Sequence, residues 1–156
     1  MQATGTDPAI GMTAGLAELS RCTVLGSAAF HRLEASECIL DDDVQVIDTQ
    51  DGCVRFSAYA KGSVLPRQYE SVAVPARAPL FTSREFGQPA YAQLQASADA
   101  AIVVGRTGAT ITAGAPDGSE MGTFAAEKIP IKERSILIKY QEFMPLGLAP
   151  VVIAVT

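Results

Sequence analysis

The chain has 156 residues, of which 48% are hydrophobic, and its mean hydropathy is +0.20. This length predicts a single domain, and the apolar content excludes an intrinsically disordered chain. The net charge is −5 and the sequence pI is near 4.8, which is the wrong sign for a surface that neutralises nucleic-acid phosphates. We therefore expect no nucleic-acid partner.

The amino terminus has neither a basic start nor a continuous apolar stretch, so it does not resemble a secretory signal. No apolar run approaches the roughly 20 residues that a membrane-spanning helix needs. These features predict synthesis in the cytoplasm without a Sec signal and no membrane span. Gly, Thr, Ala and Pro without any period predict a flexible leader over residues 1–18, followed by a single β-rich domain over residues 19–156.

The apolar residues are divided into short runs by 13 Gly and 9 Pro, which favours strands over long helices. Short β-branched and aliphatic runs separated by polar turns predict strands over residues 20–25, 30–35, 37–40, 44–48, 53–60 and 72–74. The fold class that follows is mainly β.

Three of these runs begin near a cysteine, at Cys22, Cys38 and Cys53, with intervals of 16 and 15 residues. Such spacing predicts a short β-solenoid, similar to a parallel β-helix, with the cysteines stacked as reduced thiols in its interior. The alternation of sides is imperfect, because an inward Cys53 would also turn Arg55 inward. An antiparallel β meander or sandwich is the alternative. Structural zinc is not expected, because the chain has three Cys and one His.

Beyond the strands, residues 76–90 are expected to form a long ordered loop, and residues 91–98 a short helix or an irregular segment. The runs 101–104 and 110–112 predict a hairpin around Gly105–Gly108.

Near the carboxyl end, Ile136, Tyr140 and Phe143 fall at helical spacing, which predicts an amphipathic helix of roughly three turns that ends before Pro145. We expect this helix to pack on the core or to cap one end of the solenoid. The apolar run Val151–Val155 predicts a buried strand or a strand that pairs with another chain.

Two acidic segments are candidates for ligand binding. The run Asp41–Asp43 has the oxygens that calcium prefers, but it lacks the spacing of an EF-hand, which favours a solvated turn. The second segment contains Asp117, Ser119 and Glu120, a possible ligand or interface loop for a metal or a sugar. A tight turn with an Asx-type hydrogen bond from Asp117 explains this segment more simply.

No catalytic constellation emerges from the sequence. His31, the one histidine, lies in a predicted strand without a nucleophile motif beside it, which favours a structural role. We predict no catalytic, cofactor-binding or metal-ligating residues and no cofactor.

Several strings in this sequence, in this order, resemble the C-terminal part of large uncharacterised bacterial β-helix-like proteins, some of them associated with gene clusters for phage-tail-like contractile particles. The resemblance covers most of residues 19–124, and it implies a fold type and a structural setting but no catalytic residues. The chain departs from the family pattern at Ala90, where glycine is expected, over 129–139, which is richer in Ile and Lys, and in its shorter length. The strings are 21–26, 33–41, 52–58, 65–67, 81–83, 91–94 and 117–122.

These observations predict a non-enzymatic structural or interaction protein that self-associates or docks onto a larger bacterial assembly, which the resemblance identifies as a contractile injection system or a similar particle. A short solenoid exposes both of its ends, and these need caps or protein partners. The alternatives are a carbohydrate-binding or carbohydrate-active β-helix protein, since a saccharide could bind along a face, and a delivered toxin or cargo domain.

Overall fold

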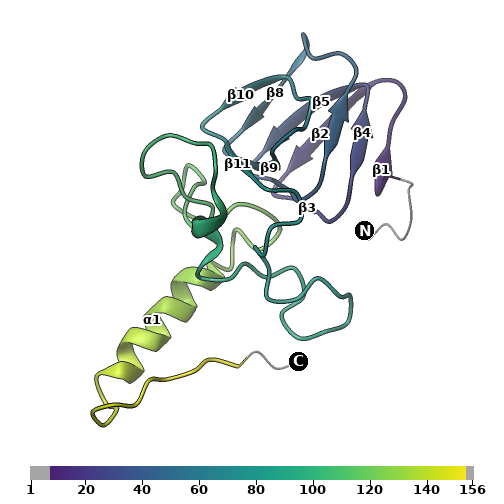
Figure 1. The fold of residues 1–156 in the computed structure, drawn as a ribbon. Coiled ribbons are helices and arrows are strands. Elements are labelled where there is room, and N and C mark those ends of the chain that lie inside the picture. Colours follow the sequence, from purple (N-terminus) through teal and green to yellow (C-terminus); the bar gives the residue numbers. More distant parts are fainter. Residues whose placement is uncertain (1–7, 154–156) are drawn as a thin grey trace.

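The computed structural model describes residues 8–153, which begin with a three-faced parallel β-solenoid of four coils. Each coil visits the three sheets in the same order, and the sheets are β1-β4-β7, β10-β8-β5-β2 and β11-β9-β6-β3. We refer to these as the first, second and third sheets (Figure 1). The elements are β1 Ile10–Gly11, β2 Leu16–Ser20, β3 Thr23–Val24, β4 Ala28–Phe30, β5 Arg32–Ser36, β6 Ile39–Leu40, β7 Val44–Val46, β8 Gly52–Arg55, β9 Ala58–Ala60, β10 Arg67–Tyr69, β11 Val72–Val74, the 3-10 helix η1 Ala98–Ala101 and the helix α1 Ile129–Gln141.

Every pairing between these strands is parallel, which confirms the predicted β-solenoid and excludes the antiparallel alternative. In the third sheet, Thr23, Ile39, Ala58 and Val72 occupy equivalent positions in successive coils. The coils therefore differ in length, because the steps between these residues are 16, 19 and 14 positions in the sequence.

One residue with positive φ turns the chain from the second sheet into the third sheet in every coil. These corner residues are Arg21, Glu37, Phe56 and Glu70, and their φ angles lie between 48° and 57°. A left-handed conformation costs a non-glycine residue roughly 1–2 kcal/mol, so the surrounding structure must compensate at each corner. The sequence does not reveal this turn, since none of the four residues is glycine.

The residue after each corner stabilises the turn with its side chain. The donors Cys22, Cys38, Ser57 and Ser71 each bond to the carbonyl oxygen two residues earlier, at distances of 3.1, 3.2, 2.7 and 3.1 Å. The predicted cysteine ladder is therefore correct for two of the three thiols, and serines continue it.

The placement of Cys53 inside the solenoid was wrong. It lies in β8 opposite Glu34 and Arg67, on the outer face of the second sheet, and Val54 is the fully buried residue of this strand. Arg55 lies on the same outer face, so the conflict between Cys53 and Arg55 disappears. The third coil step of 19 residues is what broke the apparent repeat.

Two hydrophobic cores share the third sheet. Inside the solenoid, Phe30, Leu33, Leu40, Val44 and Val54 are fully buried. On the outer side of the third sheet, a second core joins strand residues to the irregular segment 75–125, with members that include Ile39, Val72, Val74, Leu80, Leu94, Ile111 and Met121. The third sheet is thus covered on both faces, which explains why all three residues of β11 are buried.

The predicted leader 1–18 was too long. Residues 1–7 lie outside the described residues, but β1 and the start of β2 already belong to the first coil. Their composition concealed them, because β1 has two residues and Ala17 fills an inward position where only a small side chain is needed. The predicted hairpin was also wrong: Val104 pairs with Ala73 of β11, and Ile111 enters the second core.

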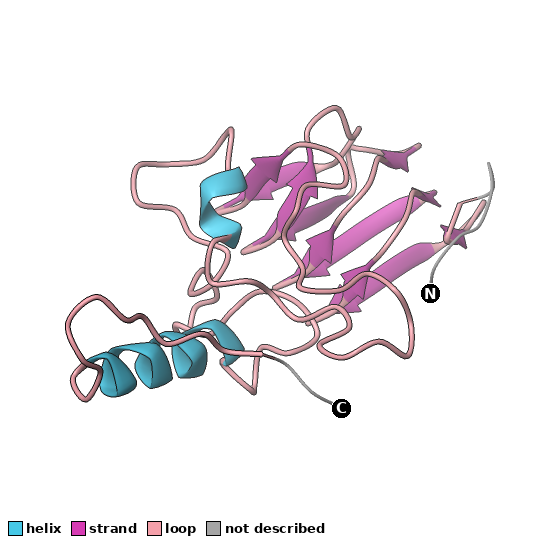
Figure 2. Cartoon of the chain, turned by 60° about the horizontal axis from the view of Figure 1, so that its bottom comes forward, coloured by secondary structure: helices cyan, strands magenta, loops and turns pink. Residues whose placement is uncertain are grey.

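The predicted C-terminal helix exists, but it neither packs on a core nor caps the solenoid. It projects away from the solenoid, and Pro130 near its start is its one buried residue (Figures 1 and 2). Residues 145–153 return beside it without forming a strand, and residues 151–153 are exposed. The expected strand at 151–155 is therefore absent over 151–153, and residues 154–155 lie outside the described residues.

The corner ladder makes a prediction about stability. Ser57 is fully buried and its hydroxyl also accepts the N–H of Cys38 at 3.0 Å, so Ser57→Ala would leave a buried donor and a buried acceptor unpaired. We expect a loss of about 1–3 kcal/mol in the free energy of unfolding, measured by chemical denaturation. Ser57→Cys, which restores the thiol found at the two preceding corners, should lose less. Equal stability of Ser57→Ala and the parent would contradict the ladder.

Candidate functional site

The loop that contains Asp117, Ser119 and Glu120 is a tight turn. The Oδ1 atom of Asp117 accepts the backbone N–H of Ser119 at 2.9 Å, which confirms the Asx-type bond. Hydrogen bonds from the hydroxyl and the backbone N–H of Ser119 lower the pKa of the Asp117 carboxyl below its usual value. Ser119 and Glu120 are fully buried, whereas the Asp117 side chain is half exposed, so the three do not form one accessible site.

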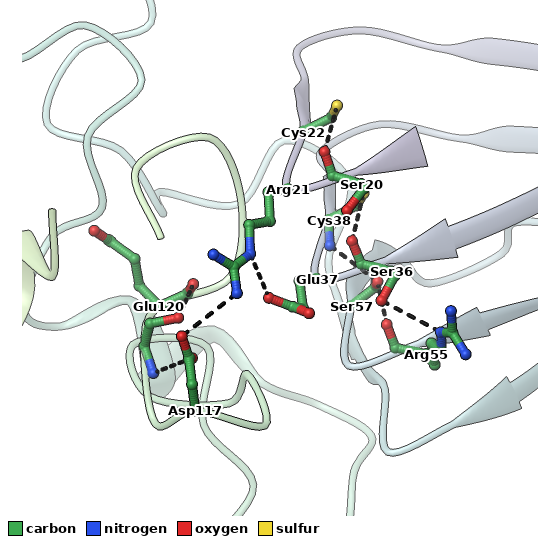
Figure 3. A network of polar contacts seen from close by, with 11 residues as sticks. Ser20, Arg21, Cys22, Ser36, Glu37, Cys38, Arg55, Ser57, Asp117 and Glu120 are labelled. Atoms are coloured by element: carbon green, nitrogen blue, oxygen red, sulfur yellow. Dashed lines mark hydrogen bonds and ion pairs between the residues drawn. The ribbon is translucent and has the colours of Figure 1, made fainter. Parts of the chain in front are cut away.

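This turn is anchored to the corner of the first two coils (Figure 3). The guanidinium of Arg21 bonds to Glu37 at 2.7 Å and reaches Asp117 at 3.4 Å. The N–H of Gly122 donates to the carbonyl oxygen of Glu37 at 2.7 Å. Two corner residues of the solenoid therefore hold a loop that lies about a hundred residues later in the sequence.

The next residues complete the attachment at β3. Thr23 and Thr123 exchange two hydrogen bonds, each from the backbone N–H of one residue to the hydroxyl of the other, at 3.0 and 3.1 Å. Gly122 has a φ of 96°, and a Cβ atom there would lie 2.6 Å from Oγ1 of Thr23 and 2.9 Å from Cδ1 of Ile39. Glycine is required at this position because the loop backbone lies directly against the third sheet.

Glu120 connects this loop to the start of α1. Its Oε1 atom accepts the N–H of Ile129 at 3.0 Å, while Oε2 is buried without a hydrogen-bond partner in the described structure. Burial raises the pKa of the Glu120 carboxyl, and the carboxylate of Glu127 adds to this effect. Glu120 thus satisfies a backbone donor at the amino end of the helix, where a negative charge also complements the helix dipole.

The acidic run Asp41–Asp43 forms the turn between β6 and β7, but it is not solvated as expected. Asp41 is fully buried and pairs with Arg84, and Asp42 is buried and bonds to Arg77 at 2.7 Å. For Asp42, burial alone would raise the pKa, but the hydrogen bond from Arg77 and that from the N–H of Asp43 lower it below its usual value. The two carboxylates anchor the irregular segment to the solenoid.

Sequence reasoning missed these two arginines and also Asp99. The Asp99 carboxylate accepts the backbone N–H groups of Ile111 and Thr112 at 2.6 and 3.1 Å and the Thr112 hydroxyl at 2.6 Å. It thereby folds the segment 99–112 over the second core. No signal in the sequence marks these contacts, since each joins residues that are distant in the chain and have no common motif.

The thiols and the histidine show no arrangement for catalysis. Burial raises the pKa of the Cys38 thiol to about 11, so it remains protonated and non-nucleophilic at neutral pH. Cys22, in the preceding coil, donates to a carbonyl oxygen like Cys38, and His31 lies at the turn between β4 and β5. Within residues 8–153, no three or more His, Cys, Asp or Glu side chains come together in a way that could hold a metal ion.

The largest exposed apolar surface lies on α1 and the residues that follow it, which together we call the C-terminal arm (129–153). Exposed fractions include 52% for Ile138, 76% for Phe143 and 81% for Val151. Other exposed members are Ile131, Ile136, Tyr140, Leu146, Leu148, Val152 and Ile153. In the described part of the chain no helix has the length and apolar character needed to cross a membrane.

Comparison with known protein families, with curated protein sequences and with solved structures finds no match for this chain.

The buried acidic turn makes a prediction with a matched control. Arg84→Ala should leave the fully buried Asp41 without its cation, which typically costs about 3–5 kcal/mol in the free energy of unfolding. Arg77→Ala removes a guanidinium whose side chain is 70% exposed, and it should cost less than about 1 kcal/mol. Urea denaturation of both variants tests the difference. Similar losses would show that Asp41 does not depend on Arg84.

Glu120 makes a prediction about pH. A carboxyl whose folded-state pKa is raised contributes stability that is fully present below its unfolded pKa and is lost as the pH rises through the raised value. Glu120→Gln should therefore increase stability at pH 7, and this gain should disappear below the unfolded pKa of the carboxyl. Asp42 and Asp117 have lowered pKa values, so they act oppositely and weaken the fold at acid pH in both proteins. A melting-temperature series from pH 3 to 8 measures the effect, and a gain that does not vary with pH would contradict it.

Proposed function

We propose that this protein is a non-enzymatic structural protein that self-associates through its C-terminal arm as part of a larger assembly. The observation that carries the proposal is the exposure of apolar side chains all around α1. Residues such as Ile131 and Ile138 lie on one side of the helix, and Ile136, Tyr140 and Phe143 lie on another. A helix that is apolar on all sides is normally buried, and apolar surface in excess of a few hundred Å² marks an interaction site.

The charges of α1 favour a second copy of this chain as the partner. In an antiparallel pair of α1 helices centred on Leu137, Lys132 of one copy lies level with Glu142 of the other. The same register sets Ile131 level with Phe143. An interface that combines apolar contact with opposite charges at both ends is self-complementary, as a two-fold dimer requires.

The solenoid supports a structural role in another way. Its charged and polar groups are used to attach one part of the chain to another, at Arg21, Glu37, Asp41 and Asp42. The resemblance to proteins from contractile-particle gene clusters supplies a candidate assembly, a contractile injection system, and synthesis without a Sec signal agrees with incorporation into such a particle.

Sedimentation tests the proposal. The full chain should form a dimer or a larger oligomer at micromolar concentration in sedimentation velocity, and the triple variant Ile136→Lys, Tyr140→Lys, Phe143→Lys should sediment as a monomer. Ile47→Lys is the matched control, because Ile47 is 72% exposed on the solenoid and should leave association unchanged. A chain that is monomeric at every concentration up to about 100 times that range would contradict self-association.

A further inference from the structure

The two ends of the solenoid differ in how their backbone is covered. At the last coil, Val103 and Val104 cover β11: the N–H of Ala73 donates to Val104 at 2.7 Å, and the N–H of Val103 donates to Ala73 at 2.9 Å. Beside β10, Pro66 has no N–H, and its carbonyl oxygen accepts Nε2 of Gln68 at 2.9 Å. Proline and self-bonded carbonyls are the devices by which natural sheets prevent edge pairing. The chain closes this end itself.

At the first coil, β3 is covered by Thr123, but β2 is not covered. Its five residues make it one of the two longest strands, and β5 is its one partner among residues 8–153. The N–H of Arg21 donates to Ser36 in β5 at 3.0 Å. Because successive residues of a strand turn their backbone groups to opposite sides, those of Leu16, Glu18 and Ser20 face away from the sheet.

Neither arrangement of a second copy fits this edge well. A head-to-tail stack would need the last coil of the other copy, where Val103, Val104 and the Pro66–Gln68 bond close the end. An antiparallel pairing of β2 with itself over all five residues would set Glu18 opposite Glu18, and like charges directly opposite each other destabilise a sheet.

The side chains beside the free edge define what an added strand must carry. Glu18 and Glu34 are paired neighbours on the outer face, so a third residue in this row should be basic. They line a groove of about 500 Å³ with Ser20, Glu37 and Arg55, where a long basic side chain has room. On the inner face Ala17 is small and Leu19 is half-buried, so apolar neighbours fit over them.

We propose that the free edge of β2 binds an extended strand from a different protein, with a lysine or arginine between two apolar residues. This proposal rests on the structural role proposed above, and it adds a docking contact that is separate from the C-terminal arm. Backbone hydrogen bonds would supply affinity, and the basic residue beside Glu18 would supply selectivity.

A peptide titration followed by amide NMR tests the proposal on the full chain. The probe is an acetylated and amidated Thr-Val-Lys-Val-Thr peptide at millimolar concentration, with Thr-Val-Glu-Val-Thr as the charge control. A third peptide, N-methylated at alternate residues, cannot pair with an edge. We expect shifts at the amides of β2, binding that is up to roughly fivefold tighter for the lysine peptide than for the glutamate peptide, and none for the N-methylated one.

The variant Glu18→Lys should reverse the preference between the two charged peptides, and since Glu18 is exposed, the substitution should leave the fold intact. Shifts outside β2, or binding that ignores charge and N-methylation, would overturn the proposal. So would β2 protection that rises with protein concentration, which would assign the edge to a second copy, and peptide binding seen only after removal of residues 1–7, which would assign it to the chain's own terminus. Sedimentation reads the arm and NMR reads the edge, so either proposal can fail without the other.

Discussion

The turn between the second and third sheets is the constraint on which the rest of the structure depends. In each coil one non-glycine residue adopts a left-handed conformation, and the following cysteine or serine bonds to the carbonyl oxygen two residues before it. The repeated bond offsets the conformational cost and keeps the corners stacked while the coil length varies. It also orients Arg21 and Glu37 outward, where they hold the Asp117 turn.

The third sheet then organises the second half of the chain. A strand with one solvated face would need polar residues at alternate positions, but β6 and β11 are buried on both faces. Their outer side chains form a core with segment 75–125, which contains little regular structure of its own. This segment is ordered by contact with the solenoid and by three carboxylates, Asp41, Asp42 and Asp99. Much of the apolar excess in the composition therefore fills a second core.

The two surfaces proposed for assembly are what remains after these internal contacts are made. The C-terminal arm carries apolar residues that neither core contains, and β2 has a row of backbone groups that residues 8–153 do not bond. The two surfaces call for different partners, because the arm is apolar and self-complementary, whereas the β2 edge is acidic. A component that contacts copies of itself and a second protein has the two contacts that a structural protein in a particle needs.

The sequence by itself determined the short strands, the solenoid class, the Asx turn at Asp117 and the presence of a helix before Pro145, because these depend on local periodicity and on turn residues. Only the tertiary structure decided which side chains face inward. The interval from Cys38 to Cys53 imitates the coil repeat, yet Ser57 is the equivalent of Cys38, because the coil between them is 19 residues long. In the same way, Asp41 resembles a solvated turn residue until Arg84, 43 positions away, packs against it. Contacts across that distance depend on coil stacking, and no local pattern of residues encodes them. The apolar composition showed that the chain folds, and the structure showed that part of its apolar surface remains exposed on the arm.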